Sequence, residues 1–302
     1  MTQRTDVTFC SGKSKHKAEC AGWLYLPEKK DKKPPVIVMA HGLSGTKDMR
    51  LPAFAEVFSG AGYACLVFDY RHFGASGGEP RQLIDIDHQL EDWRAAIEYA
   101  RSRSDQVDTQ QVVLWGSSFS GGHVIKLGAE DSSIKAIISQ CPFTNGIASA
   151  STLNPVTLTK VSAIAIADLT GALLGAKPIT IKAAGKPGEA VLMDAPDAES
   201  GMLKIVGPGS PWKNEVIARF VLQITRYFPG TKAKNLTMPA LFCVCLPDSV
   251  APSKQTLKHV SQAKKGTVNT YDFGHFDVYT GSGFDALSAD QLAFLQAKVP
   301  VN

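Results

Sequence analysis

Short apolar runs alternate with amphipathic segments along the chain, and this alternation constrains the fold more than any other feature. Residues 36–40, 64–70 and 111–115 are apolar runs, as expected of strands buried on both faces. Residues 85–103 place apolar side chains at helical spacing between two of these runs. The pattern predicts βαβ units and therefore an α/β protein with a mostly parallel, doubly wound sheet.

The same reasoning assigns the other core elements. Strands are expected at 6–9, 19–27, 134–140, 240–246 and 267–273, and helices at 51–59, 253–262 and 284–299. Residues 144–235 break the rhythm with two helical patterns, at 161–174 and 212–228, where Ser210 and Pro211 suit a helix start. We therefore expect a core formed by 1–143 and 236–302, and a helical cap at 144–235. A helical insertion that only packs on the sheet is the alternative.

Composition excludes several classes of partner. A net charge of +4 over 302 residues, without a basic stripe, is not typical of a nucleic-acid-binding protein. The longest apolar segment, 161–175, is shorter than a spanning helix of ~18 residues and contains Asp168, so no membrane association is expected. The first ten residues lack the apolar stretch of a secretory signal, which favours a cytoplasmic location.

No cofactor or metal is expected. The six cysteines do not form a CxxC pair or lie beside histidines. The glycine-rich stretch 69–81 follows a strand, but it has neither the G-x-G-x-x-G spacing nor a phosphate-binding lysine. We interpret it as a loop in which Asp69 and Arg71 bond to the backbone.

The stretch "LWGSSFSGGHV" at 114–124 carries the main chemical signal. It places small residues between an apolar run and a helical pattern, as in a G-x-S-x-G turn that exposes a nucleophilic serine. Gly116 is then the first glycine and Ser118 the nucleophile, while Ser120 replaces the last glycine. Ser117 and Ser120 are interpreted as small residues that the turn tolerates.

A serine nucleophile needs a base, and on this scaffold the histidine comes last in the chain. Of the seven histidines, only His259 and His275 follow Ser118 at a distance. His259 lies within a helical pattern and is expected at the surface, whereas His275 follows a strand and a glycine. His123 lies on the same helix as Ser118 and points the wrong way.

The acid is expected at a strand end between the serine and the histidine, and Asp248 meets this condition. Asp272 and Asp277 are too local to orient the ring of His275 and should bond nearby backbone. The oxyanion donors would be the backbone N–H groups of Phe119, which follows the serine, and of Leu43, in the His41-Gly42 turn. His41 itself is interpreted as a structural member of that turn.

These motifs together resemble a known superfamily. "HGLSG", "DYRHFGASGGEP", "GSSFSGG", "PDSVAP" and "GHFDVY" occur in the order and spacing of the α/β-hydrolases, over nearly the whole chain. Within them the chain resembles dienelactone-hydrolase-like and X-Pro-peptidase-like enzymes, and the fungal polyketide transferase group in particular. The resemblance implies a Ser118–Asp248–His275 triad, Leu43 and Phe119 as oxyanion donors, and acyl chemistry without a cofactor. Ser120 departs from the motif.

Four functions remain open. The first is a serine hydrolase that cleaves an ester, lactone or thioester of a hydrophobic acyl substrate. The second is an acyltransferase or thioesterase that passes a polyketide chain to an alcohol, with a carrier protein or polyketide synthase as partner. A ligand-binding module and carbon–carbon bond hydrolysis are the others. The expected substrate is a small acyl molecule, and a homodimer is compatible with the sequence.

Overall fold

The computed structural model describes residues 2–13, 16–28 and 32–301. Its main sheet has eight strands in the order β1-β2-β4-β3-β5-β6-β10-β11. Strands β4, β3, β5, β6, β10 and β11 are mutually parallel, while β1 and β2 are antiparallel to their neighbours. The strands are β1 Gln3–Ser11, β2 Ala18–Leu26, β3 Pro35–Ala40, β4 Ala64–Phe68, β5 Asp108–Ser117, β6 Ala136–Gln140, β10 Ala240–Cys245 and β11 Gly266–Tyr271.

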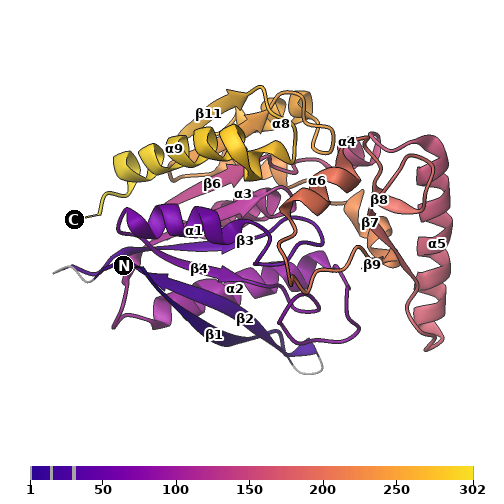
Figure 1. Ribbon diagram of the computed structural model, residues 1–302, viewed down its shortest axis with the longest axis horizontal. Helices are drawn as coiled ribbons and strands as arrows, with labels where there is room; N and C mark the ends of the chain where they lie inside the picture. The colour runs from indigo at the N-terminus through magenta and orange to yellow at the C-terminus, as the bar shows by residue number, and fades with distance from the viewer. Residues whose placement is uncertain (1, 14–15, 29–31, 302) are drawn as a thin grey trace.

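Helices cover both faces of this sheet (Figure 1). They are α1 Leu51–Gly60 and α9 Gly281–Lys298 on one face, and α2 Ile86–Ser102, α3 Phe119–Glu130 and α8 Ser253–Val260 on the other. In β3, Val36 and Val38 join one apolar cluster and Ile37 and Met39 the other, all without solvent exposure. The predicted doubly wound α/β sheet is therefore confirmed, because continuous apolar runs suit strands that are buried on both faces.

The segment 144–235 extends beyond the carboxyl ends of the parallel strands, on the right of Figure 1. It contains α4 Gly146–Ala150, α5 Pro155–Leu173, α6 Ala198–Ile205, α7 Val221–Ile224 and 3-10 helices at Ala218–Phe220 and Pro229–Asn235. It also contains a small sheet in the order β8-β7-β9, formed by β7 Thr180–Ala184, β8 Val191–Met193 and β9 Val216–Ile217. The segment is a mixed structure rather than a purely helical one.

The helix predicted at 212–228 is wrong. Val216 and Ile217 form β9 and pair antiparallel with β7, and only residues 221–224 are α-helical. Ser210 does not cap a helix, since its hydroxyl accepts the N–H of Trp212 within a local turn. Of the residues at helical spacing, Val216, Phe220 and Val221 are buried, whereas Ile224 and Phe228 are only partly buried. Pairing with a distant strand determines the backbone at Val216.

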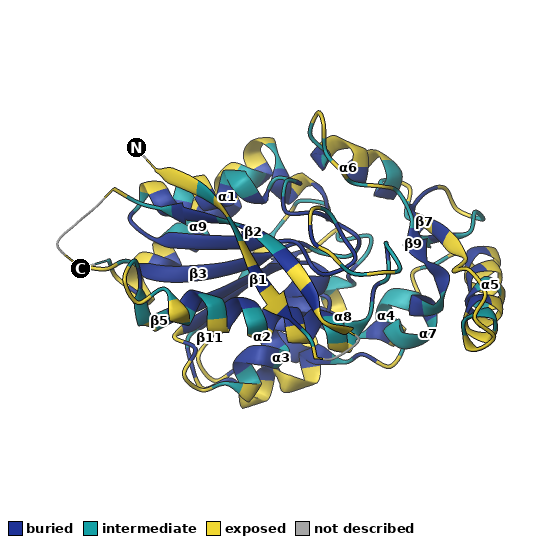
Figure 2. Cartoon of the chain, turned by 90° about the horizontal axis from the view of Figure 1, so that it is seen from below, coloured by how far each residue is buried: buried dark blue, intermediate teal, exposed yellow. Residues whose placement is uncertain are grey.

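Helix α5 is the most exposed element of this segment (Figure 2). It begins earlier than predicted, because the Asn154 side chain accepts the N–H of Val156 and Pro155 occupies the first turn. By length and composition alone this 19-residue helix could cross a membrane, a test that helices of soluble proteins also pass. Asp168 is buried against the segment itself and pairs with Arg219 at 2.8 Å.

Candidate active site

The carboxyl ends of four parallel strands converge on one place in the structure. Ser118 follows β5, Asp248 follows β10, His275 follows β11 and Leu43 follows β3. This is the edge of an open α/β sheet where ligands usually bind. Each predicted site residue therefore lies just beyond the strand to which the sequence assigned it.

Ser118 lies on a sharp turn between β5 and α3. Its φ of 57° and ψ of −115° are unusual for a residue with a side chain. The turn leaves no space at Gly116, where a Cβ would overlap the Ser120 carbonyl. The Ser118 N–H donates to the Gln140 carbonyl of β6 at 2.8 Å, and its own carbonyl accepts from Phe143 at 2.9 Å. The surrounding backbone therefore holds the strained serine in place.

Ser118, His275 and Asp248 form a continuous hydrogen-bonded chain. The Nδ1 of His275 lies 2.7 Å from Oδ2 of Asp248, and its Nε2 lies 3.0 Å from Oγ of Ser118. Because a carboxylate only accepts, Nδ1 carries the hydrogen and the bare Nε2 can take the hydroxyl proton of Ser118. The other carboxylate oxygen of Asp248 accepts the N–H groups of Val250 and Ala251.

The surroundings favour a basic imidazole. Burial lowers the pKa of His275, but the charge of Asp248 and its hydrogen bond outweigh burial, so the pKa is raised above the ordinary 6.5. Both side chains are almost completely buried, which limits screening of this interaction by water. The imidazolium formed after proton uptake is therefore stabilised where it forms.

The neighbouring serine is not positioned to react. Ser117 is fully buried, and its hydroxyl bonds to the Tyr279 hydroxyl at 2.6 Å and to the Gln140 amide at 3.0 Å. Sequence reasoning treated Ser117 only as a small residue. In the structure it links the turn that bears Ser118 to the segment that follows His275, and no sequence pattern signals this contact.

Leu43 and Phe119 both line the cavity beside Ser118. Phe119 is the first residue of α3, so its N–H has no acceptor within the helix. Gly42 approaches Ser118 so closely that a Cβ there would lie 2.8 Å from the Ser118 Cβ. The two predicted donor residues thus flank the serine.

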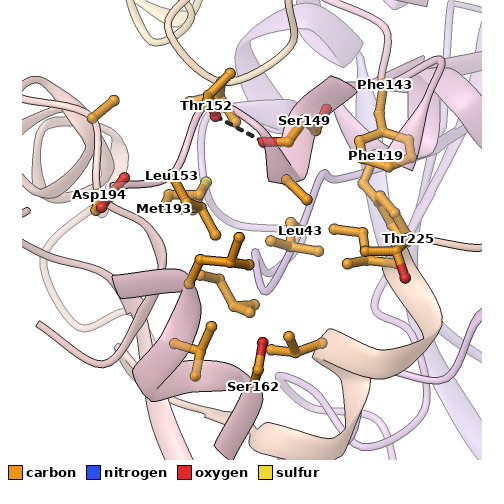
Figure 3. Close-up of a pocket in the computed structure, with 18 of the residues that line it drawn as sticks. Leu43, Phe119, Phe143, Ser149, Thr152, Leu153, Ser162, Met193, Asp194 and Thr225 are labelled. Carbon is orange, nitrogen blue, oxygen red and sulfur yellow. Dashed lines mark hydrogen bonds between the residues drawn. The ribbon is translucent and has the colours of Figure 1, made fainter. Parts of the chain in front are cut away.

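A cavity of about 340 Å³ opens at Ser118, and apolar side chains dominate its wall (Figure 3). Leu43, Phe119 and Phe143 come from the core, whereas Leu153 and Met193 come from the segment 144–235. Such a mainly apolar cleft with few polar groups is typical of small-molecule sites. Residues of the segment 144–235 therefore form part of the cavity wall beside Ser118.

One group of metal-ligating side chains occurs within the described ranges. The candidate ligand atoms of Cys141, Asp248 and His275 lie within 4.8 Å of one another. Asp248 and His275 are already bonded to each other, and the Cys141 sulfur lies 3.4 Å from that of Cys245. A metal there would have to break the hydrogen bond that orients the imidazole.

The other side chains weighed in the sequence have structural contacts. His123 is fully buried between Tyr227 and Gln89, and burial lowers its pKa to about 3. Asp277 accepts the Gly274 N–H, as expected of a local contact. The expected surface position of His259 is wrong, because this residue is buried and its ring lies against Gly230.

The loop at 69–81 has the expected backbone bonds. Asp69 accepts the N–H groups of Lys47 and Ala75, and Arg71 donates to the His16 carbonyl. Asp69 also forms an ion pair with the Lys47 ammonium, and Arg71 with Asp92. These bonds tie the loop that follows β4 to Lys47, shortly after the Leu43 turn, and to Asp92 of α2.

Comparison with known proteins supports the same fold. Residues 31–275 match the family model Hydrolase_4, described as serine aminopeptidase, S33. The chain belongs to this family. It is an α/β-hydrolase enzyme, which confirms the predicted superfamily.

Two relatives and one solved structure illustrate this membership. The chain is 51% identical to the quorum-quenching protein AidA of Acinetobacter baumannii, over 98% of this chain and 95% of AidA. It is 27% identical to a polyketide transferase of Stachybotrys chlorohalonatus, covering 91% and 92%. A crystal structure of the α/β hydrolase GrgF from Penicillium superposes with a TM-score of 0.82 at 24% identity, covering 99% and 100%.

Proposed function

We propose that this enzyme is a serine hydrolase in which Ser118, His275 and Asp248 form the catalytic triad. The observation that carries the proposal is the 3.0 Å contact between the hydroxyl of Ser118, which lines an apolar cavity, and Nε2 of His275. A hydroxyl becomes a useful nucleophile only beside such a base, with an acid that fixes the tautomer.

The reaction would proceed in two steps. His275 takes the Ser118 proton as the oxygen attacks a carbonyl carbon, and the N–H groups of Leu43 and Phe119 stabilise the resulting oxyanion. The tetrahedral intermediate collapses, and His275 gives the proton to the departing alcohol or thiol. Water then repeats the sequence on the acyl-enzyme and releases the acid.

The cavity wall supports an ester, lactone or thioester whose acyl part is hydrophobic. Leu153 and Met193 would contact the acyl chain far from the reacting bond, and its burial would contribute binding free energy. The relative from Acinetobacter is named a quorum-quenching protein, so acylated lactones that serve as bacterial signals are the first natural-type substrates to test.

A series of p-nitrophenyl esters from acetate to laurate tests this function. We expect kcat/KM to rise with chain length until the cavity is full, and Ser118→Ala to remove turnover of every ester. Acyl lactones would then be assayed by ring opening. Turnover that persists at the wild-type rate in Ser118→Ala would contradict the proposal.

A second candidate function is transfer of the acyl group to an alcohol instead of water. The acyl donor would be a thioester bound to a carrier protein, and the reaction would take place inside the cell. The similarity to a polyketide transferase along almost the whole chain favours it. Product analysis with a thioester donor, with and without added alcohols, separates the two. Ester formation that competes with acid release would support transfer, and acid alone with every alcohol would exclude it for those acceptors.

A further inference from the structure

Ser120 occupies the position where the turn motif has its last glycine, and its side chain has specific partners. It is fully buried, and its hydroxyl donates to the His41 carbonyl at 2.5 Å. The Tyr70 hydroxyl is hydrogen-bonded to the same Oγ, and the Trp93 indole N–H donates to Tyr70 at 2.7 Å. All of these side chains are buried.

The hydrogen bonds that link Trp93, Tyr70, Ser120 and the His41 carbonyl can be donated in only one direction. The indole of Trp93 is a donor only and the His41 carbonyl an acceptor only. Tyr70 must then donate to Ser120, and Ser120 to His41. Each donor polarises the next one, which strengthens the final bond to the carbonyl. This series of hydrogen bonds therefore ends on the backbone of the His41–Gly42–Leu43 turn, called here the oxyanion turn because it bears the proposed donor Leu43.

That backbone is held from a second side. The Nδ1 of His41 lies 2.8 Å from the Gly42 carbonyl oxygen and must donate to it. Burial lowers the pKa of His41, which keeps the ring neutral. In a trans peptide the C=O and N–H point in opposite directions, so fixing the Gly42 carbonyl also fixes the N–H of Leu43.

We propose that Ser120 is a positioning residue that holds the His41–Gly42–Leu43 turn so that the Leu43 N–H points at the oxyanion. The inference rests on the proposed function of Leu43 and extends it to a residue that the motif leaves as glycine. A glycine would leave the buried Tyr70 hydroxyl and His41 carbonyl without this link. The serine thus couples the turn that bears the nucleophile to the turn that bears the oxyanion donor.

The test compares Ser120→Ala with Ser139→Ala. Ser139 is an equally buried serine whose hydroxyl donates to the carbonyl of Gly121, at 2.8 Å, in the same helix α3. Both changes remove one serine-to-carbonyl hydrogen bond, but only Ser120 bonds to the oxyanion turn. Each variant is assayed with a p-nitrophenyl ester, and its affinity is measured for an alkyl trifluoromethyl ketone, which forms a tetrahedral oxyanion on the nucleophile.

For Ser120→Ala we expect kcat to fall about tenfold, less than the ~10²–10³-fold typical of losing an oxyanion donor outright. KM should stay within about twofold, and affinity for the ketone should fall in parallel with kcat. Ser139→Ala should keep both values near wild type. Equal losses in the two variants, or a kcat of Ser120→Ala that matches wild type, would overturn the inference.

Tyr70→Phe gives a second test if Ser120→Ala folds poorly. It keeps Ser120 but removes the donor behind it, and a smaller fall in kcat with unchanged KM is expected. No change in kcat would contradict the directed chain. The ketone affinities also distinguish failure of this inference from failure of the proposed function. If the wild-type enzyme shows no affinity for the ketone, both claims are contradicted. If wild type and Ser120→Ala bind it equally tightly, only this inference is contradicted.

Discussion

The turn around Ser118 and the segment 144–235 contribute opposite sides of the same cavity, yet they are specified differently. Ser118, Gly116 and the strands beside them are buried, and neighbouring backbone fixes each of them. At the end of α5, by contrast, Leu173 and the adjacent Leu174 are more than 80% exposed. The difference indicates that the core holds the proposed catalytic side chains in a fixed geometry. Substitutions in the segment 144–235, which lines the proposed acyl cavity, should leave that geometry unchanged.

The largest expected effect is the loss of turnover in Ser118→Ala. Removing the nucleophile of such a triad lowers kcat by about 10⁴- to 10⁶-fold. Ser117→Ala breaks bonds to Tyr279 and Gln140 but should keep measurable activity, within about tenfold of wild type. Steady-state rates with one activated ester measure both. Comparable losses would mean that the turn was assigned to the wrong serine.

Asp248→Asn comes next, with a fall in kcat of about 10⁴-fold. The pH profile gives an independent sign. Wild-type kcat/KM should decline as the pH falls through the raised pKa of His275, with a midpoint above 6.5. Without the carboxylate, burial dominates and lowers this pKa, so the residual activity should persist to lower pH. An acid limb that moves upward would contradict the assigned pairing.

Asp168→Ala should loosen the segment 144–235 while leaving the core intact. Asp168 accepts N–H groups from Ile179 and Arg219 and pairs with the Arg219 guanidinium. Loss of a buried charge partner lowers the free energy of unfolding this segment by about 3 kcal/mol. The backbone amides of the segment should then exchange about 100-fold faster. Hydrogen exchange read by mass spectrometry should show this at 155–224 and not in β3 or β5. Equal acceleration in both regions would show that they are not independent.

The smallest effect is expected from filling the cavity. Leu153 lines the cavity, and we expect only long acyl chains to reach it. Leu153→Trp should therefore lower kcat/KM for long-chain esters about tenfold and leave acetate within about twofold. Leu173→Trp, on the exposed side of α5, is the matched control and should change neither. Rates across the ester series decide the matter. A uniform loss for all chain lengths would place Leu153 outside the acyl path.

The same contrast explains what the sequence could predict. The order of the core elements and the positions of Ser118, Asp248 and His275 at strand ends follow from local patterns: continuous apolar runs, a small-residue turn and glycine before histidine. The structure of the segment 144–235 was harder to predict, because contacts with residues distant in the sequence determine its secondary structure. β9 pairs with β7 across more than thirty residues, and the apolar spacing at 216–228 suits a helix equally well. The roles of Ser117 and Ser120 depend on contacts with Tyr279 and His41, which no spacing reveals.

Mass-spectrometric mapping of a fluorophosphonate adduct tests the central claim most directly, because this reagent modifies only a serine that a base activates. The account predicts a single adduct on the peptide that contains 116–122, located at Ser118, which is lost in Ser118→Ala and greatly slowed in His275→Ala. An adduct at Ser117 or Ser120, or labelling that survives in Ser118→Ala, would contradict it.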